Sequence, residues 1–502
     1  MRKSSAFRIQ ATVAVLIGRV ESTCALGHNR RVAGKSPEIL VLGGGPAGCA
    51  AARVLSACGH DVLLVTRPAA DRRPLPESIP PSTGKLFDLL GIRSAIDGAG
   101  FLRTSGNTVW WGNPRGRVET FEQGACGWQV TSDRLEPLLL QSSIDAGARV
   151  EFKRMDADQA DRSGAAFILD CSGRTGVMAR ARAMRRTSHV PATVALAGLW
   201  KTPALAIADP THTWIESYGT GWAWSVPIAN DLRYFSVMVD PRTSELAQDR
   251  NARALYLAEL SKTRVFADVT RSAMLVDGPS GWDASMYDAE GYYADNLLLV
   301  GDAASFIDPL ASIGVKKALA SGWLAGVATH TALIRPSMRA TALDFYAARE
   351  REIFAAFERL TADYLAAAAV SHAHPFWTDR VDATSAATGV DLQLVQDAFE
   401  RIKAVASLQL ERSPTLRIED RAAVSGAEIV LERRVVSDQN PAGVRFVHDV
   451  DVLALVDLAP DCVDVPQLFD AYNRANAPVS LQDFLAALST SVARHWLLLR
   501  DR

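Results

Sequence analysis

The chain has 502 residues, 48% of them hydrophobic, and a formal net charge of −2 at pH 7. This length predicts roughly two to four folding units, and the near-neutral charge provides no field that would gather nucleic acid or an anionic membrane. No apolar run reaches the ~18 residues that a membrane span needs, so we expect a globular protein.

Residues 1–36 precede the first predicted strand. Their short apolar stretch is bracketed by Arg8 and Arg19, a poor imitation of a secretory signal, so we expect a disordered or helical extension or a start codon placed too early. The six cysteines form no C-x-x-C pair and no Cys/His ligand spacing, which favours reduced thiols in a cytoplasmic protein. His372 and His374 do not share a helix face, so no metal site is expected.

The first strongly patterned segment is an apolar strand at residues 39–42, followed by Gly43, Gly45 and Gly48 in a G-x-G-x-x-G arrangement and a predicted helix at 49–55. The first glycine allows the tight turn, the second lets a pyrophosphate approach the backbone, and the third lets helix and strand pack closely. The helix N-terminus also favours phosphate groups. We expect a dinucleotide here rather than an unliganded glycine-rich loop, with contacts from Gly43, Gly45, Pro46, Ala47 and Gly48.

The second predicted strand, residues 61–65, does not identify the dinucleotide. NAD-type folds carry Asp or Glu about 20 residues beyond the glycines, whereas this strand is followed by Thr66 and Arg67. Because the Thr66 hydroxyl replaces an acidic ribose ligand only weakly, a second motif has to decide.

Three features follow in chain order. Pro76–Ser82 contains Glu77 and two adjacent prolines, which stiffen the segment. Residues 88–111 lie between elements of the cofactor domain and are expected to cross over the ligand. A helix is predicted to start near Thr131, and Arg134 within it is either a cofactor contact or a surface residue.

Residues 186–275 break the alternation of strands and helices. Residues 194–200 and 232–239 have the pattern of strands, and between them lies the segment G-W-A-W-S-V-P. Its Trp222 and Trp224 point to the same side, because alternate residues of a strand share a face. The alternative interpretation is an ordinary hydrophobic sheet face.

A second cofactor motif lies far downstream. Residues 296–300 form a predicted strand that ends in Gly301 and Asp302, and a turn at 308–314 leads into a helix that carries Lys316. For the Gly-Asp pair, an ordinary strand-to-turn junction is the alternative.

Together with the Ser/Gly turn that follows the strand at 166–170, the two motifs resemble those of the flavoprotein monooxygenases. In that family the Asp of G-D-A holds an FAD ribityl hydroxyl, and the next helix points its N-terminus at the flavin, where it stabilises the charge of the reduced ring. The resemblance implies an α/β fold, in which a Rossmann-like FAD-binding domain carries an inserted antiparallel substrate sheet. The cofactor contacts that it implies, beyond the glycine motif, are Thr66, Arg67, Ser78, Arg134, Gly301, Asp302, Pro309, Ser312, Ile313, Gly314 and Val315.

The G-W-A-W-S-V-P segment is similar to the W-x-W-x-I-P signature of flavin-dependent halogenases, which implies that Trp222 and Trp224 lie beside the flavin on the substrate side. Two reactive groups of tryptophan halogenases are missing, because Leu102 or Arg103 stands where their Lys is and Ala311 where their Glu is. An Arg stays protonated and cannot replace that lysine. Arg103 is therefore kept as a substrate-side candidate, and halogenation ranks second.

With halogenation ranked second, the resemblance implies an FAD-dependent monooxygenase, with O2 as co-substrate and NAD(P)H as reductant. In this family a flavin C4a-hydroperoxide hydroxylates an electron-rich aromatic ring, while the protein excludes water and supplies a proton. Glu77 is the candidate flavin contact or proton handler, with a solvated loop charge as the alternative. Lys316 is the candidate positive charge for the reduced flavin, with a solvated helix lysine as the alternative.

The last third contains a long amphipathic helix at 341–370, a helix near 391–407, and a terminal unit in which two strands precede three short helices. That order suggests a small winged-helix-like domain, and its balanced charge favours protein docking over nucleic acid. The resulting division is an N-terminal extension at 1–36, an FAD-binding domain at 37–185 and 276–335, a substrate domain at 186–275, a helical region at 336–425 and a winged-helix-like C-terminal domain at 426–502.

This organisation resembles the flavoproteins that hydroxylate a protein tryptophan in cysteine tryptophylquinone biogenesis, of the quinohemoprotein amine dehydrogenase maturation type. The resemblance implies a tryptophan-containing protein or peptide partner within a maturation complex, and neither nucleic acid nor a membrane. A small-molecule aromatic hydroxylase, a halogenase and a non-enzymatic flavin-bearing docking scaffold remain alternatives.

Overall fold

The computed structural model describes most of the chain after residue 35, and the predicted extension at 1–36 lies outside the described residues except for Ser36. The chain divides into two compact units, the first comprising 1–386 with 426–428 and the second 387–425 with 429–502. The described ranges are 36–68, 73–203, 209–244, 251–383, 392–404, 407, 409–438 and 440–500.

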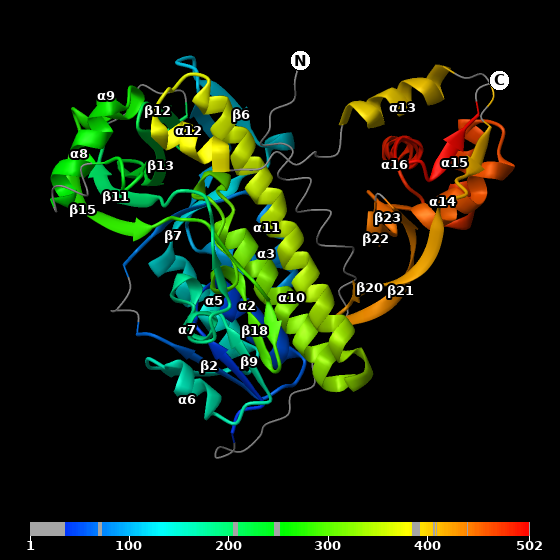
Figure 1. Ribbon diagram of the computed structural model, residues 1–502, viewed down its shortest axis with the longest axis horizontal. Coiled ribbons are helices and arrows are strands. Elements are labelled where there is room, and N and C mark those ends of the chain that lie inside the picture. Colours follow the sequence, from blue (N-terminus) through cyan, green and yellow to red (C-terminus); the bar gives the residue numbers. More distant parts are fainter. Residues whose placement is uncertain are drawn as a thin grey trace. The chain divides into compact units, whose positions relative to one another are not determined.

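A six-stranded sheet in the order β17-β18-β9-β1-β2-β8 forms the centre of the first unit (Figure 1). Its strands are parallel except at the β17 edge. The four inner strands are buried along their whole length and are apolar except for Thr66 and Asp170 at the ends of β2 and β9. This confirms the predicted Rossmann-like α/β core. The strands are β1 (Ile39–Leu42), β2 (Val62–Thr66), β8 (Arg149–Phe152), β9 (Phe167–Asp170), β17 (Tyr293–Ala294) and β18 (Leu297–Leu299).

Two helices that start at the predicted cofactor motifs pack directly against each other. They are α2 (Pro46–Ala57) and α10 (Gly314–Ile334). Close packing is possible because α10 has glycine at the contact: a Cβ at Gly322 would lie 2.1 Å from the Ala47 carbonyl oxygen. The shorter helices around this core are α3 (Gly84–Leu89), α4 (Arg93–Gly98), α5 (Ser132–Asp145), α6 (Ala157–Asp161) and α7 (Val177–Ala181).

The sheet predicted to bind substrate, called the substrate sheet below, has seven strands in the order β15-β11-β14-β13-β12-β5-β6. One face packs against the helices α8 (Ala252–Lys262) and α9 (Val265–Thr270). The expected limits of 186–275 are too narrow, because the end of the 88–111 segment joins this sheet, where β5 pairs in parallel with β12. The strands are β5 (Gly106–Trp110), β6 (Arg117–Thr120), β11 (Val194–Lys201), β12 (Thr213–Tyr218), β13 (Gly221–Ala229), β14 (Leu232–Val239) and β15 (Met274–Asp283).

A three-stranded antiparallel sheet, β3-β7-β4, lies between the cofactor core and the substrate sheet. Opposite residues of paired strands share a face, so Ser78, Gln129 and Leu102 lie on one side. Thr213 of β12 donates a hydrogen bond to Ser78 at 2.8 Å, which identifies that side as the one facing the substrate sheet. The strands are β3 (Pro76–Ile79), β4 (Leu102–Thr104) and β7 (Gly127–Thr131).

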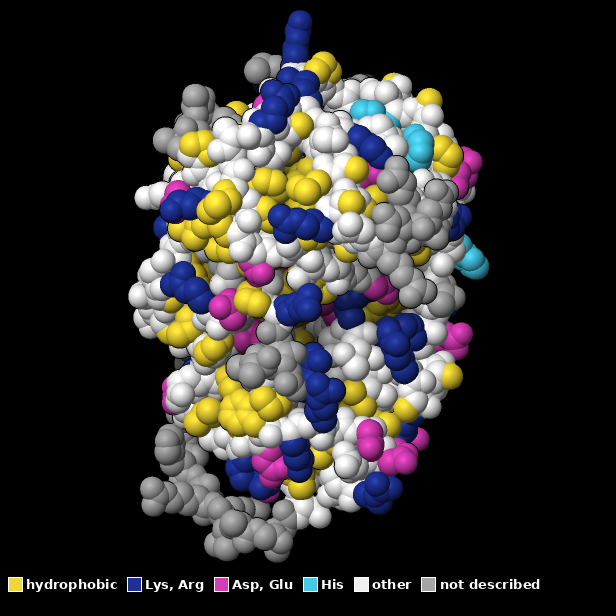
Figure 2. Space-filling model, turned by 90° about the vertical axis from the view of Figure 1, so that its left-hand side faces the viewer, with side chains coloured by type: hydrophobic (Ala, Val, Ile, Leu, Met, Phe, Trp, Pro, Cys, Tyr) yellow, Lys and Arg dark blue, Asp and Glu magenta, His cyan; other side chains and the backbone are white. Residues whose placement is uncertain are grey.

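The predicted long helix is confirmed as α11 (Arg339–Ala369), and it is followed by α12 (Pro375–Ala383). Both contribute side chains to an apolar cluster on the second face of the substrate sheet. Two short strands, β10 (Arg185–Thr187) and β16 (Tyr287–Ala289), pair with each other in this unit. None of the helices in the described ranges has the length and apolar character to cross a membrane. On the face drawn in Figure 2, basic and acidic side chains are interspersed.

The second unit has its own apolar core, which includes Trp496, Phe484 and residues of α13. It begins near residue 387 and not at the predicted 426, because α13 packs in this core and β19 pairs with β25 near the end of the chain. A winged-helix-like fold stays a prediction. The elements are α13 (Leu392–Ala404), β19 (Leu410–Arg412), β20 (Arg417–Ser425), β21 (Glu428–Ser437), β22 (Asn440–Val444), β23 (Phe446–Val447), β24 (Val450–Asp451), α14 (Val452–Leu458), α15 (Val465–Ala475), α16 (Leu481–Ala493) and β25 (Leu497–Leu499).

Candidate active site

The glycine loop between β1 and α2 has the shape of an anion-binding turn. Gly43 has a φ of +110°, and a Cβ at Gly48 would lie 1.8 Å from the Gly43 carbonyl oxygen, so neither position accepts a side chain. A Cβ at Gly45 would meet only Glu136 Oε1, at 3.9 Å, among described atoms. The N–H groups at the start of α2, including Ala47, have no side-chain cap from Gly45, so this end of the helix fits a pyrophosphate.

Thr66 supports this loop from the end of β2. Its hydroxyl accepts a hydrogen bond from the Gly44 N–H at 3.0 Å, and the residue is 3% exposed. The neighbouring Arg67 is exposed. Thr66 therefore braces the backbone of the glycine turn, and contacts of Thr66 and Arg67 with a ribose stay predictions.

Asp302 lies where the parallel strand β18 ends, next to the glycine loop. Gly301 adopts a φ of +64° to make the turn, and the Asp302 side chain is 31% exposed. Burial raises the pKa of Asp302, and the positive charges of Lys317 and Arg174 offset part of that shift. Lys317 Nζ is 3.8 Å from Asp302 Oδ1. A partly accessible carboxylate at this edge fits a ligand hydroxyl.

Glu77 projects from β3 toward the same edge. Burial, together with the negative charges of Asp302 and Glu136, raises the pKa of Glu77 to about 8. Glu77 therefore lies within electrostatic range of carboxyl groups from two distant segments. The alternative that Glu77 is a freely solvated loop charge is therefore wrong. Because its pKa lies above neutral, the carboxyl group keeps its proton near neutral pH.

Lys316 stands in the first turn of α10 and is 3% exposed. Its Nζ donates a hydrogen bond to Ser82 Oγ at 2.9 Å. Burial, together with the positive charge of Lys85, lowers the pKa of Lys316 to about 8. The alternative of a solvated helix lysine is therefore wrong. This amine joins α10 to the proline-rich segment after β3.

The turn before α10 leaves polar groups available. Ser312 has a φ of +49°, and its buried Oγ has no hydrogen-bond partner among the described residues. A Cβ at Gly314, the first residue of α10, would meet no described atom within 4 Å. These features fit a ring system placed before the helix N-terminus. Asp308 caps the turn by accepting from the Leu310 N–H at 2.9 Å. Of the other predicted contacts here, Ile313 and Val315 have buried side chains, which leaves their backbone for a ligand.

Two predicted arginines lie on the outside. Arg134 is exposed, donates to the Ala99 carbonyl at 2.8 Å and lies over the Phe101 ring. Arg103 donates to Asp97 at 2.8 Å and lies over the Trp128 ring. Arg103 therefore points away from the substrate sheet, contrary to the prediction, because neighbouring strand residues alternate in direction. Leu102 is the residue that faces inward, and the cofactor contact of Arg134 stays a prediction.

Trp222 and Trp224 share one face of β13, as predicted, but they differ in burial. Trp222 is 2% exposed, with its ring centroid 6.2 Å from that of Trp111, whereas Trp224 is half-buried. Trp222 is therefore covered by other side chains, and only Trp224 is partly accessible. Sequence reasoning missed the covering residues Trp111 and Trp377, although the W-W pair and the P-F-W segment that contain them are visible in the sequence. Trp111 Nε1 donates to the Tyr364 carbonyl at 2.8 Å.

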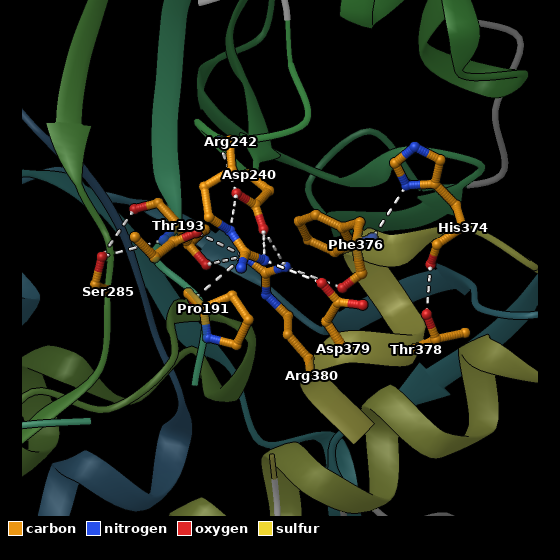
Figure 3. Close-up of polar contacts among 11 residues, drawn as sticks. Pro191, Thr193, Asp240, Arg242, Ser285, His374, Phe376, Thr378, Asp379 and Arg380 are labelled. Carbon is orange, nitrogen blue, oxygen red and sulfur yellow. Dashed lines mark hydrogen bonds and ion pairs between the residues drawn. The ribbon is translucent and has the colours of Figure 1, made fainter. Parts of the chain in front are cut away.

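An ion pair that the sequence did not reveal fixes α12 over the sheet (Figure 3). Arg380 is 2% exposed and lies 3.1 Å from Asp240 Oδ2. It also donates to the Ala192 carbonyl at 2.7 Å and to Thr193 Oγ1 at 3.1 Å. Burial raises the pKa of Asp240, but bonds from Arg242 and Arg380 outweigh it and hold this pKa below its ordinary value. We call Thr193, Asp240, Arg242 and Arg380 the roof clamp.

Comparisons with known proteins agree with this geometry. Residues 36–359 match the model of a family described as FAD binding domain. The tryptophan 2-halogenase of Chondromyces crocatus is 28% identical over 341 residues, which cover 62% of this chain and 64% of that relative, just under two thirds of its length.

Among solved structures, the flavin-dependent halogenase CmlS has a TM-score of 0.76 at 20% identity and covers 93% of this chain and 96% of its own. The peptidyl tryptophan dihydroxylase QhpG, essential for tryptophylquinone cofactor biogenesis, has a TM-score of 0.60 at 21% identity and covers 90% of this chain and 97% of its own. At such identities the likeness is one of fold.

Proposed function

The chain belongs to the family of FAD-binding domains, and on that premise we propose that it is an FAD-dependent monooxygenase that hydroxylates an indole ring. The substrate is a tryptophan side chain of a partner protein in quinone cofactor biogenesis, NAD(P)H is the source of electrons, and O2 is the co-substrate. Bound FAD supplies the oxygen activation. One observation carries the proposal: the inward-facing position of β4 is the apolar Leu102.

The residues that would hold FAD come from three places in the fold. The N-terminus of α2 suits the pyrophosphate, Asp302 suits a ribityl hydroxyl, and the N-terminus of α10 with Ser312 suits the flavin ring. The start of α2 has no side-chain cap, and Ser312 Oγ has no hydrogen-bond partner in the described part of the chain. The Asp302 carboxylate is partly exposed beside Lys317.

Side chains of the protein would deliver a proton, stabilise charge and exclude water. Glu77 holds a proton at neutral pH beside this site and can deliver it to the leaving oxygen. Lys316 places a positive charge in the first turn of α10, where it stabilises electron-rich states. The buried rings of Trp222 and Trp377 keep water from the substrate face of the sheet.

Leu102 supports hydroxylation over halogenation. Tryptophan halogenases, which this chain resembles, use a lysine amine to handle hypochlorous acid. Neither Leu102 nor the outward-facing Arg103 provides such an amine. Ala311 likewise stands where those enzymes have a glutamate. Halogenation stays the second candidate because several relatives, including that of Chondromyces crocatus, carry halogenase names.

The deciding experiment supplies the FAD-loaded protein with NAD(P)H, ¹⁸O2, bromide and a tryptophan-containing partner protein, followed by peptide mapping. The proposal expects ¹⁸O on an indole ring of the partner and no bromine. Bromine on the ring would establish the halogenase alternative. A flavoprotein that consumes neither NAD(P)H nor O2 when the partner is added would be a docking scaffold.

A further inference from the structure

Glu350 of α11 is a buried carboxyl group that the proposed mechanism does not use. Its exposed fraction is 0%, and neither of its oxygens has a hydrogen-bond partner among the described residues. A carboxyl group in this state is unfavourable when ionised, so a protein retains it where its charge has a role.

The cation whose charge lowers the pKa of Glu350 is Lys317 of α10, whose side chain is 0% exposed. Lys317 Nζ donates to the Gly301 carbonyl at 3.2 Å and to the Ser305 carbonyl at 2.5 Å, so it ties both ends of the loop that carries Asp302. The ammonium lies 3.8 Å from Asp302 Oδ1. Lys317 therefore links the charge of Glu350 to the loop that faces the predicted cofactor.

The backbone of the same loop is held from α10 and α11 by neutral groups. Ser321 Oγ accepts from the Gly301 N–H at 2.8 Å, and Tyr346 Oη donates to the Leu299 carbonyl at 2.6 Å. These bonds fix the loop without charge. Glu350 itself makes no hydrogen bond to the loop among the described residues, so its buried charge calls for another explanation.

The groups that face Glu350 come from each neighbouring element. They are Lys317 and the hydroxyl of Ser321 on α10, Asp302 in the loop, Asp288 on β16, and the hydroxyls of Tyr292 and Tyr346. Burial and the negative charges of Asp288 and Asp302 raise the pKa of Glu350, Lys317 and Ser321 oppose this, and the resulting pKa is about 7. The group that titrates among them at neutral pH is Glu350.

We propose that Glu350 is a positioning residue that acts through Lys317 and takes up a proton when the bound cofactor is reduced. The inference rests on the proposed function only in requiring bound FAD. NAD(P)H transfers a hydride, two electrons with one proton, to the bound cofactor and leaves as NAD(P)+. One further proton from water adds to a Glu350 oxygen, and that proton returns to water when the cofactor is reoxidised. The buried cluster of Asp302, Lys317 and Glu350 thereby becomes less negative as the cofactor becomes more so.

The experiment measures the reduction potential of the FAD-loaded protein against pH for the wild type and Glu350→Gln. Below about pH 7 Glu350 is already protonated, so the two potentials should run in parallel. Above that pH, uptake of the extra proton should make the wild-type potential fall more steeply than that of the variant. Equal pH dependence of the two proteins would overturn the inference.

Glu259 offers a matched control, because it is a buried carboxylate (2% exposed) on the far side of the substrate sheet. Unlike Glu350 it has partners: Tyr218 at 3.0 Å, Thr220 at 2.9 Å and Lys262 at 2.6 Å. Glu259→Gln should lower stability and keep the wild-type pH dependence. Loss of the steeper slope in this control would mean that any buried carboxyl change disturbs the potential, which also overturns the inference.

A second measurement needs no variant. The infrared difference spectrum between reduced and oxidised wild-type protein at pH 7.5 should contain a new carbonyl stretch of a protonated carboxyl group. Its absence contradicts proton uptake by Glu350 even where Glu350→Gln does not fold. Protein that takes up no FAD at all would instead refute the proposed function itself.

Discussion

The buried carboxyl groups around the predicted cofactor site, the cofactor side, differ from that of the roof clamp in how fully they are partnered. In the roof clamp, Arg380 has carboxylate, carbonyl and hydroxyl acceptors, and the pKa of Asp240 stays below its ordinary value. On the cofactor side, burial raises the pKa values of Glu77 and Glu350 to about 8 and about 7. The first arrangement fixes geometry, and the second keeps protons available near neutral pH.

The difference indicates which region performs chemistry. Perturbed carboxyl groups without full partners cluster at functional sites, because catalysis requires pKa values close to the working pH. A satisfied ion pair between α12 and the substrate sheet instead holds a wall in place. Removing one partner of an ion pair in the roof clamp should therefore lower the free energy of unfolding. On the cofactor side, substitutions that change the shape of the glycine loop or the protonation of a carboxyl group should have the larger effects.

The largest expected effect is steric and lies on the cofactor side. Gly48→Ala should abolish FAD binding, because the added Cβ would lie 1.8 Å from the Gly43 carbonyl oxygen. FAD content after purification measures this. Gly98→Ala is the control, because a Cβ there meets no described atom within 4 Å. A Gly48→Ala protein with full FAD content would mean that the loop does not have to be this tight.

Arg380→Met should have the next largest effect, a loss of about 3–5 kcal/mol in the free energy of unfolding, because it leaves Asp240 buried without its inner partner. Urea unfolding measures the loss. Arg242→Met removes the other cation of the same carboxylate, but its side chain is 54% exposed, so the loss should stay below about 1 kcal/mol. Equal losses in the two variants would show that the roof clamp is an ordinary surface pair.

The features behind these predictions divide into those that a local sequence pattern indicates and those that arise from contacts between distant segments. The glycine turn after β1 and the Gly301-Asp302 turn after β18 could be predicted, because glycine spacing and a short apolar strand are local signals. The same holds for α11, whose length and periodicity exceed those of its surroundings. The predicted FAD-binding core follows from these segments.

What the sequence could not provide arises from contacts between distant segments. Arg380 and Asp240 are 140 positions apart, and nothing near either residue indicates the pair. The direction of Arg103 depends on the register of β4 against β7, and a shift of one residue would have turned Leu102 outward. The burial of Lys316 likewise depends on Ser82, which a different segment delivers.

The stability of Glu77→Gln at different pH values tests whether the Glu77 carboxyl group on the cofactor side is protonated near neutral pH. The pKa of Glu77 in the folded protein, about 8, lies above its ordinary value of 4.5, so the folded state binds more protons and the wild type loses stability as pH rises between these values. The variant avoids this loss. Its stability relative to wild type should grow by roughly 1–2 kcal/mol, after allowance for partial exposure, in urea unfolding of FAD-free protein at pH 5 and pH 8.5. A difference independent of pH would place Glu77 in solvent.

The smallest effect concerns the brace behind the glycine loop. Thr66→Val keeps the shape of the side chain and removes the hydroxyl that accepts from the buried Gly44 N–H. A buried donor without an acceptor costs about 1–3 kcal/mol, and we expect the low end because neighbouring backbone can shift slightly. Faster release of FAD should accompany the loss, since the loop that faces the pyrophosphate would be less rigid. Thr66→Ser retains the hydroxyl and should behave as wild type. If Thr66→Ser lost as much as Thr66→Val, the methyl contact of Thr66 with the loop, and not its hydrogen bond, would be what holds Gly44 in place.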